Sequence, residues 1–309
     1  MNKKGSTGSA QRPGILRGIS RGPAPWLAPL AVILLLLFVY PTFEVLRYSF
    51  TDASILRNTY NYTFKTYRNI LTNPQTYEVL KITFIFVIFS VLMQTVLGLI
   101  TALAIDKGEA LRLKGTVFIR VAVLLSWAIP GVIVGVVWSF LYNESATGIL
   151  TAILKNIGVQ GVAFLTKPFN ALVCVIIANI WRGTAQSMIL SYAGLKTIPG
   201  EMLEAGQIDG ANAWQRLLRI ILPSLFPVIS TNVILNTIMT FNTFDMVMSL
   251  TGGGPGRSTE VLAMTSYYSI FRTHQLGRGS AYAVLLLLIN SLIAVLYFYI
   301  LKKRGDTNA

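Results

Sequence analysis

Long apolar runs separated by short polar stretches dominate the pattern of this chain. Six of these runs approach the roughly 20 residues that an α-helix needs to cross a bilayer. Because backbone polar groups in lipid can bond only to one another, we expect each run to be helical. The predicted spans are Trp26–Tyr48, Val79–Ile105, Thr116–Leu141, Ala171–Leu195, Ser224–Leu250 and Ala281–Leu301. We see neither a soluble domain nor an internal repeat between them, so the pattern predicts an all-α integral membrane protein.

Composition supports this prediction. Of the 309 residues, 53% are hydrophobic and 12% are charged, and the charged fraction is about half the ~25% of a soluble domain. The formal net charge of +14 would also suit a nucleic-acid-binding protein. The basic residues, however, punctuate the apolar runs instead of forming one patch. We therefore expect a lipid bilayer and no nucleic acid among the partners.

Lysine and arginine are concentrated in the tails and connections that lie on one side of the membrane if each apolar run crosses it once. They are frequent in the N-terminal tail, between Lys107 and Arg120, and around Lys302. Because cytoplasmic loops carry an excess of these residues, we expect a multi-pass protein of the cytoplasmic (inner) membrane with both termini cytoplasmic. Residues 1–22 then form a basic cytoplasmic tail and residues 23–309 the transmembrane domain.

The chain offers little material for enzymatic chemistry. Cys174 is the only cysteine and His274 the only histidine, which argues against an internal disulfide, a histidine-rich metal site and a Ser-His triad. The stretch Thr251–Thr259, TGGGPGRST, invites comparison with a phosphate-binding loop. Its glycine spacing is too short, Arg257 stands where lysine is needed, and no strand precedes it. We expect no catalytic site and no metal site.

Proline and glycine mark points where helices bend or pack closely. Pro130 should kink or break the third run, and Pro41 should act similarly near the end of the first. Gly131 and Gly135 are four residues apart, a spacing that allows another helix to approach closely. A short surface helix is expected after the first run, where four apolar residues share a helical face: Phe64, Tyr67, Ile70 and Leu71.

Polar residues inside the fourth and fifth runs recur at three- and four-residue steps, so each set shares one helical face. They are Asn179, Arg182, Gly183 and Gln186 in the fourth run, and Asn236, Thr240 and Thr243 in the fifth. An arginine in lipid costs ~2.5–3.5 kcal/mol on insertion scales, so Arg182 should face a cavity or a partner. The alternatives for the asparagines and threonines are solute binding and hydrogen bonding between helices. Trp127 and Phe241 would suit either stacking on a solute or packing.

The stretch Ile198–Pro223, IPGEMLEAGQIDGANAWQRLLRIILP, lies between two long runs on the predicted cytoplasmic side. Pro199 suits a helix start, and Gly210 permits a bend. A second helical segment, residues 211–222, should end at Pro223. The pattern favours either a rigid helix–elbow–helix that docks on another protein or an ordinary interfacial amphipathic helix.

This stretch resembles the "EAA" loop of permease subunits in binding-protein-dependent ABC importers. The matching residues are Glu204-Ala205-Gly206, Asp209-Gly210-Ala211, Ile220, and Leu222-Pro223. Gly206 departs from the family pattern, which has a second alanine there; helix stability should fall by up to ~1 kcal/mol. Other motifs fit the sugar-transporting members in the expected order: Trp181-Arg182, Ala193-Gly194-Leu195, Phe244-Asp245, and LTGGGP followed by TEVL.

The resemblance implies a six-helix type I ABC importer permease that translocates a carbohydrate by alternating access, with glycerol phosphate left open because Arg182 would suit an anion. It implies no ATP site in this chain, with ATP and Mg²⁺ bound on two ATPase subunits. A second, similar permease and an extracytoplasmic solute-binding protein complete the expected complex. The implied ATPase-coupling residues are Glu204, Ala205, Gly206, Ile208, Asp209 and Gly210. The family's substrate contacts come from the fourth and fifth spans, which favours binding by Asn179 and Asn236.

Two rival functions are considered. A stand-alone secondary transporter driven by an ion gradient would be expected to show repeated halves, and a docking loop would have no purpose in it. A membrane-anchored assembly protein without transport is the other. Copurification with an ATPase and ATP-dependent uptake would separate all three.

Overall fold

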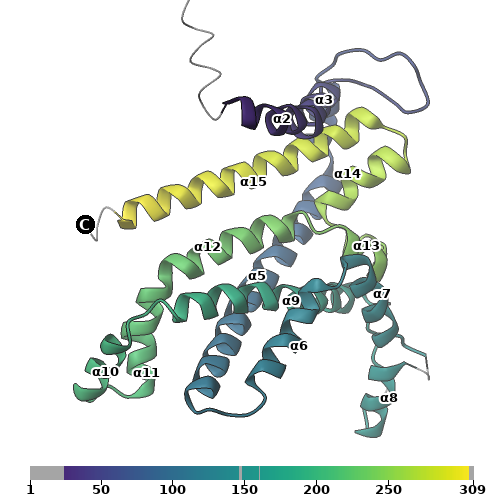
Figure 1. Cartoon of the computed structure of the whole chain (residues 1–309). Helices are drawn as coiled ribbons and strands as arrows, with labels where there is room; N and C mark the ends of the chain where they lie inside the picture. The colour runs from purple at the N-terminus through teal and green to yellow at the C-terminus, as the bar shows by residue number, and fades with distance from the viewer. Residues whose placement is uncertain (1–23, 146–147, 160, 306–309) are drawn as a thin grey trace, which may run out of the picture.

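The computed structural model describes residues 24–145, 148–159 and 161–305, and this part of the chain is built from helices (Figure 1). Within it, one isolated antiparallel bridge joins Thr51 and Tyr62 and no longer strand forms. The predicted all-α class is confirmed, whereas the basic tail predicted at residues 1–22 lies outside the described residues. The elements are α2 (Ala24–Leu34), π-helical η1 (Leu35–Val39), α3 (Tyr40–Ser49), α4 (Lys65–Thr72), α5 (Pro74–Ala110), α6 (Thr116–Ala128), α7 (Gly131–Leu141), α8 (Ile149–Asn156), α9 (Pro168–Leu195), α10 (Gly200–Ile208), α11 (Ala213–Arg216), π-helical η2 (Leu217–Ile221), α12 (Leu222–Phe241), α13 (Asp245–Thr251), α14 (Leu262–Phe271) and α15 (Leu276–Gly305).

Five continuous helical stretches of the described chain are long and apolar enough to cross a membrane. They are Trp26–Ser49, Pro74–Ala110, Pro168–Leu195, Ala213–Phe241 and Leu276–Tyr299. The bent pair α6–α7 supplies a sixth if it is counted as one span. The six predicted apolar runs therefore all correspond to helical segments, and the third and fifth runs are each divided between two helices.

The third run breaks where the sequence predicts a break. Helices α6 and α7 meet at an angle of 105°, and the two residues between them, Ile129 and Pro130, are extended, with ψ of 128° and 139°. Proline lacks the N–H that a helix needs and clashes with the preceding turn. Beyond the break, α7 packs on α13 so closely that an ideal Cβ on Gly135 would lie 2.0 Å from Ser249 Oγ.

The prediction of a fifth span at Ser224–Leu250 is wrong at both ends. The helix begins at Ala213 and stops at Phe241, and the short helix α13 follows after a break. At the break, the Asn242 side chain donates to the Ile238 carbonyl at 2.7 Å and the Thr243 hydroxyl to the Met239 carbonyl at 3.1 Å. These side chains occupy carbonyls in the last turn of α12, a competition with the backbone that favours helix ends.

The prediction that a second cytoplasmic helix ends at Pro223 is also wrong. An Asn212–Gln215 capping box starts α11 at Ala213, and the helix continues through η2 into α12. The wider π turn of η2 ends two residues before Pro223, just as η1 ends two residues before Pro41. A π turn shifts the hydrogen-bond register by one residue, so the proline is accommodated without ending the helix.

The surface helix predicted around Tyr67 is present as α4. Only two of the four apolar residues of the predicted face pack against the rest of the protein. Ile70 is buried and Tyr67 packs beside it, whereas Phe64 and Leu71 are exposed. This part of the chain sits near one end of α15, with α3 alongside α15 (Figure 1).

Helices α5, α9 and α12 form the centre of the molecule, with α10 and α11 projecting together at one end (Figure 1). Helices α5 and α9 approach each other closely: an ideal Cβ on Gly98 would fall 2.3 Å from Ser187 Cβ and 2.8 Å from the Met188 nitrogen. Buried side chains fill the remaining space, among them Phe86, Val175 and Met246. This packing fixes the faces of α9 and α12 that carry the polar residues.

Candidate functional site

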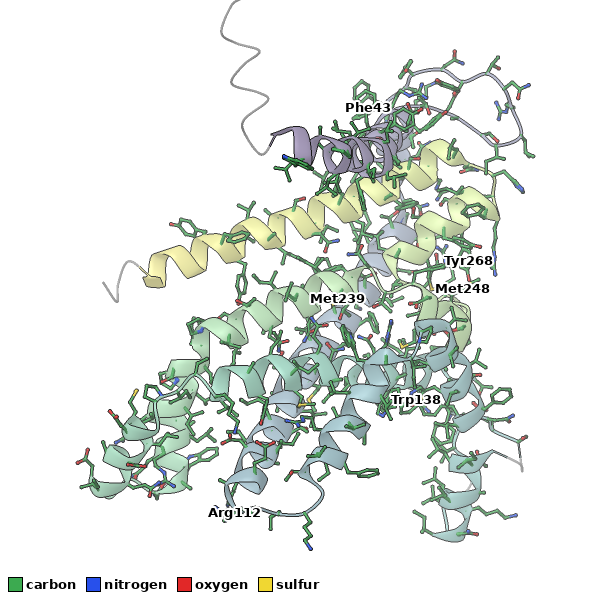
Figure 2. The ribbon with its side chains drawn as sticks, in the orientation of Figure 1. Phe43, Arg112, Trp138, Met239, Met248 and Tyr268 are labelled. Carbon is green, nitrogen blue, oxygen red and sulfur yellow. The ribbon has the colours of Figure 1, made fainter. Side chains whose placement is uncertain are left out.

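A cavity of about 330 Å³ lies where α5, α6, α9 and α12 converge. All seven residues that the sequence selects, six polar ones and a glycine, line it together: Asn179, Arg182, Gly183, Gln186, Asn236, Thr240 and Thr243. The remaining lining residues are Gln94, Trp127, Ile238, Met239, Asn242 and Asp245. Met239, labelled in Figure 2, marks the α12 wall of this cavity. The predicted faces of the fourth and fifth runs therefore meet at one place, and their role in binding a solute stays a prediction.

On the α9 wall, Gln94 holds the backbone next to the cavity. Its Nε2 donates to the Asn179 carbonyl at 2.8 Å, and it lies so close to Gly183 that an ideal Cβ there would be 2.3 Å from that nitrogen. The side chain of Asn179 is buried, and its Nδ2 has no hydrogen-bond partner among the described residues. A buried amide without a hydrogen-bond partner destabilises the folded protein. We therefore expect another group to accept a hydrogen bond from Asn179 Nδ2 in at least one state of the protein.

On the α12 wall, Asn236 joins two helices. Its Nδ2 donates to Ser187 Oγ on α9 at 2.7 Å and to Asn232 Oδ1 at 3.2 Å. Of the two roles considered for the asparagines, interhelical hydrogen bonding is thus present at Asn236. Asn179, by contrast, has a free donor.

The charged residues of the cavity form a pair. Arg182 NH1 lies 3.7 Å from Asp245 Oδ1, with side chains that are 28% and 40% exposed. Asp245 is the first residue of α13, and its carboxylate rests on Gly131 at the start of α7, where an ideal Cβ would come within 1.9 Å of Oδ2. Arg182, which was predicted to face a cavity or a partner, therefore pairs with Asp245. Gly131, at the break in the third run, leaves the space that the Asp245 carboxylate occupies.

Two aromatic residues were considered for stacking on a solute. Phe241 is buried and makes an edge contact with Phe84 at 5.4 Å between ring centroids, so its role is packing. Trp127 is 49% exposed and lines the cavity. Of the two rings, only that of Trp127 is placed to meet a solute.

Gln94 and Asp245 are cavity residues that the pattern did not select. Each carries a signal of the same kind, because each is a polar group in a predicted apolar run. Asp245 is the one acidic residue of the run 224–250, and an acid within a span is expected to face a cation. The partner, Arg182, is distant in sequence and belongs to another run, so the pair emerges only from the fold.

The coupling residues predicted on the cytoplasmic side divide into two groups. Glu204, Ala205, Asp209 and Gly210 are exposed, and Ile208 is 86% exposed. Gly206 is buried, and an ideal Cβ on it would lie 2.6 Å from Ile220 Cδ1. Gly210 adopts the left-handed conformation with φ of +77°, which turns the chain between α10 and α11 at little cost for glycine. The predicted elbow is confirmed, with one face of α10 held against η2 and the other free.

The sequence signature of the family described as "Binding-protein-dependent transport system inner membrane component" matches residues 23–305. The chain is 31% identical over 281 residues to the trehalose/maltose transport system permease protein MalF of Thermococcus litoralis, covering 91% of this chain and 93% of that protein. It is 29% identical to the sn-glycerol-3-phosphate transport system permease protein UgpA of Agrobacterium fabrum, covering 90% and 94%.

The fold is similar to that of solved structures. One is a bacterial ABC transporter that imports the acidic polysaccharide alginate, with a TM-score of 0.80, 22% identity, and coverage of 94% of this chain and 98% of that chain. The alginate transporter in complex with a periplasmic protein that holds an alginate pentasaccharide matches with a TM-score of 0.76, 22% identity, and coverage of 92% and 96%. At this identity the likeness concerns the fold, and it agrees with the expected type I importer bundle.

Proposed function

Since the chain belongs to the family of binding-protein-dependent transport system inner membrane components, we propose that it is a permease subunit of an ATP-driven importer for a neutral carbohydrate. The cavity forms this subunit's part of the path along which the cargo crosses the membrane. Residues 198–223 transmit the conformational change of an ATPase subunit to the membrane-spanning helices. The chain itself is not an enzyme: ATP and Mg²⁺ act on ATPase partner subunits. The cargo crosses by alternating access between the two sides of the membrane.

We propose a neutral cargo because the charges that line the cavity balance each other. Arg182 and Asp245 are the two charged residues of the lining, and they face each other. Neutral amides and hydroxyls provide most of the other polar groups, with the indole of Trp127 beside them. Sugars are recognised by such hydrogen-bonding groups together with an apolar surface. An anion such as glycerol phosphate would have to compete with Asp245 for the arginine, although several relatives are named as sn-glycerol-3-phosphate permeases.

The partners follow from the family and from the surface of α10. A second homologous permease would complete the cargo path, an ATPase dimer would bind the coupling stretch, and an extracytoplasmic binding protein would deliver the solute. The 86% exposure of Ile208 on a short helix outside the spans supports a protein contact there, because an apolar side chain gains most by being covered. The distribution of lysine and arginine supports cytoplasmic termini in the inner membrane.

A secondary transporter driven by an ion gradient is the rival function. It would leave the exposed coupling stretch without a partner and the match over residues 23–305 to a binding-protein-dependent family without an explanation. ATP dependence of uptake separates the two.

Asn179→Ala should weaken transport several-fold and change sugar preference while the complex still assembles. The variant removes a donor that has no partner in the described part of the protein, and one hydrogen bond to a neutral sugar contributes ~0.5–1.5 kcal/mol. Uptake is measured across a panel of sugars in proteoliposomes, with copurification of the ATPase as the assembly control. Thermal stability should be unchanged or slightly raised, since an unpaired buried amide is lost.

Asn236→Ala provides the contrast, with Ser187→Ala as its matched control. Both remove the bond between Asn236 and Ser187, which should lower stability by ~1 kcal/mol. Only Asn236→Ala also removes the bond to Asn232 and changes the cavity wall. If Asn179→Ala and Asn236→Ala both assemble and both keep wild-type uptake and preference, these residues only join helices and the solute binds elsewhere.

A further inference from the structure

Five side chains from three helices meet where the coupling stretch leaves α9. Asp106 and Glu109 lie near the end of α5, Arg120 on α6, Tyr192 on α9, and Lys196 at the C-cap of α9. We call these residues the Glu109 cluster. Arg112, labelled in Figure 2, marks the turn from α5 to α6 beside it.

Glu109 is the centre of this cluster because its carboxylate is shared by all three helices. Its Oε1 lies 3.4 Å from Arg120 NH1, and its Oε2 lies 3.3 Å from Lys196 Nζ and accepts a hydrogen bond from the Tyr192 hydroxyl. Lys196 also donates to Asp106 Oδ1 at 2.7 Å. The hydrogen bond to Asp106, and then that to Glu109, raises the pKa of Lys196 above its usual value.

The Glu109 cluster fixes the relative positions of three helix ends but adds little to the stability of the fold. Its charged side chains are 28–48% exposed, and isolated pairs of that exposure contribute little. The Tyr192 ring adds restraint, because Lys196 Nζ lies 5.0 Å and the Arg120 guanidinium 5.7 Å from its centroid. A carboxylate with partners on two other helices fixes three helix ends relative to one another.

An apolar layer continues the connection into the coupling stretch. Ile198 and Ile221, which lie at the two ends of that stretch, pack against a buried group. It consists of Ala102 and Ile105 on α5, Met188 and Leu195 on α9, and Leu225 on α12. Gly206 then brings α10 onto Ile220. The chain of contacts therefore runs from α10 through η2 and Ile198 to the ends of α5, α6 and α9.

We propose that Glu109 is a positioning residue that makes the coupling stretch and the ends of α5, α6 and α9 move as one rigid body. The same three helices carry the cavity residues Gln94, Trp127 and Arg182, so a displacement of α10 reaches the cavity through them. The inference rests on the proposed function for the origin of that displacement, which is the binding of ATP to a partner subunit. Without Glu109, the stretch moves while the cavity does not follow.

Two cargo-independent measurements on the full complex in nanodiscs test this inference, with Cys174 replaced by alanine throughout. Spin labels at Gln207→Cys on α10 and Leu113→Cys after α5, both exposed positions, report the distance across the cluster. A cysteine at Gln186 in the cavity reports the rate of modification by a water-soluble maleimide. Each is recorded with and without a non-hydrolysable ATP analogue.

With Glu109 intact, the distance distribution stays narrow and unchanged on nucleotide binding, and the maleimide rate changes by about fivefold or more, the lower end of typical coupling between sites. In Glu109→Gln the distribution broadens even without nucleotide, and the nucleotide-dependent change in rate is lost although the analogue still binds. Tyr192→Phe, which removes only the hydroxyl, gives an intermediate result and serves if Glu109→Gln does not assemble. Glu44→Gln is the matched control, because Glu44 pairs with Arg47 on α3 far from the coupling stretch.

The inference is overturned if Glu109→Gln, or Tyr192→Phe in its place, keeps both the wild-type distance distribution and the wild-type nucleotide response. Failure of the proposed function has a different signature. If no ATPase copurifies with the unaltered protein, the nucleotide arm is lost, and the width of the distance distribution without nucleotide still decides the role of Glu109.

Discussion

Replacing Ala205 with proline should abolish uptake while leaving the protein in the membrane. Ala205 lies in the middle of the nine-residue helix α10, and its carbonyl accepts the Asp209 N–H at 2.9 Å. Proline inside a helix costs ~3 kcal/mol, because it removes a donor and clashes with the preceding turn. A helix of nine residues should unfold under that cost. Ile208 would then leave its exposed position on α10, and the contact of Gly206 with Ile220 would be lost.

The measurement pairs uptake in proteoliposomes with copurification of the ATPase. Gln207→Ala is the control, since Gln207 is an exposed residue of α10 outside the predicted coupling set and alanine is the best helix former. The spans should be unaffected, because α10 lies outside them, so the amount of protein in the membrane fraction should equal wild type. Wild-type uptake and ATPase recovery in the proline variant would show that α10 is an ordinary surface helix.

Replacing Gly98 with alanine should destabilise the whole helical assembly. A single added carbon would lie 2.3 Å from Ser187 Cβ and 2.7 Å from the Ser187 carbonyl carbon, and the backbone of α9 cannot move aside as a flexible side chain would. Overpacking of this kind costs ~1–3 kcal/mol and occasionally more. Since α9 carries Asn179, Arg182 and Gln186, the cavity should also be displaced.

The midpoint of thermal unfolding in detergent measures this effect, and we expect a fall of several degrees with a smaller monodisperse fraction. Gly200→Ala is the matched control, because no atom lies within 4 Å of the added carbon at that position. Equal unfolding midpoints for the two variants would mean that α5 and α9 are not as closely packed as described.

Much of the fold follows from hydropathy and helical spacing. The apolar runs predict where helices lie, because lipid leaves the backbone no other partner. Spacing by three and four residues placed Asn179, Arg182 and Gln186 on one face, and the fold brings that face to the same cavity as Asn236 and Thr240. A break was predicted at Pro130 because proline lacks the N–H that a helix needs, and α6 does end just before it.

The misplaced boundaries have physical causes that hydropathy does not contain. Apolarity continues past Phe241, so hydropathy does not mark the end of α12, where the side chains of Asn242 and Thr243 bond to carbonyls of the last turn. Pro223 is a helix breaker by rule, yet the π turn of η2 carries the helix through it. The partnership of Arg182 with Asp245 depends on the break in α12 and on Gly131, and no local pattern reports either.

Transport by the reconstituted complex, with a mixture of neutral sugars and glycerol 3-phosphate offered through the binding protein, is the decisive measurement. ATP and Mg²⁺ are enclosed in the proteoliposomes on the side of the ATPase subunits, and the binding protein and the solutes are added outside. Mass spectrometry then identifies the solutes that accumulate inside. We predict accumulation of a neutral sugar that requires ATP and Mg²⁺, is insensitive to ionophores, and is lost in Ala205→Pro. Accumulation that proceeds without ATP and collapses with the ion gradient would contradict this function.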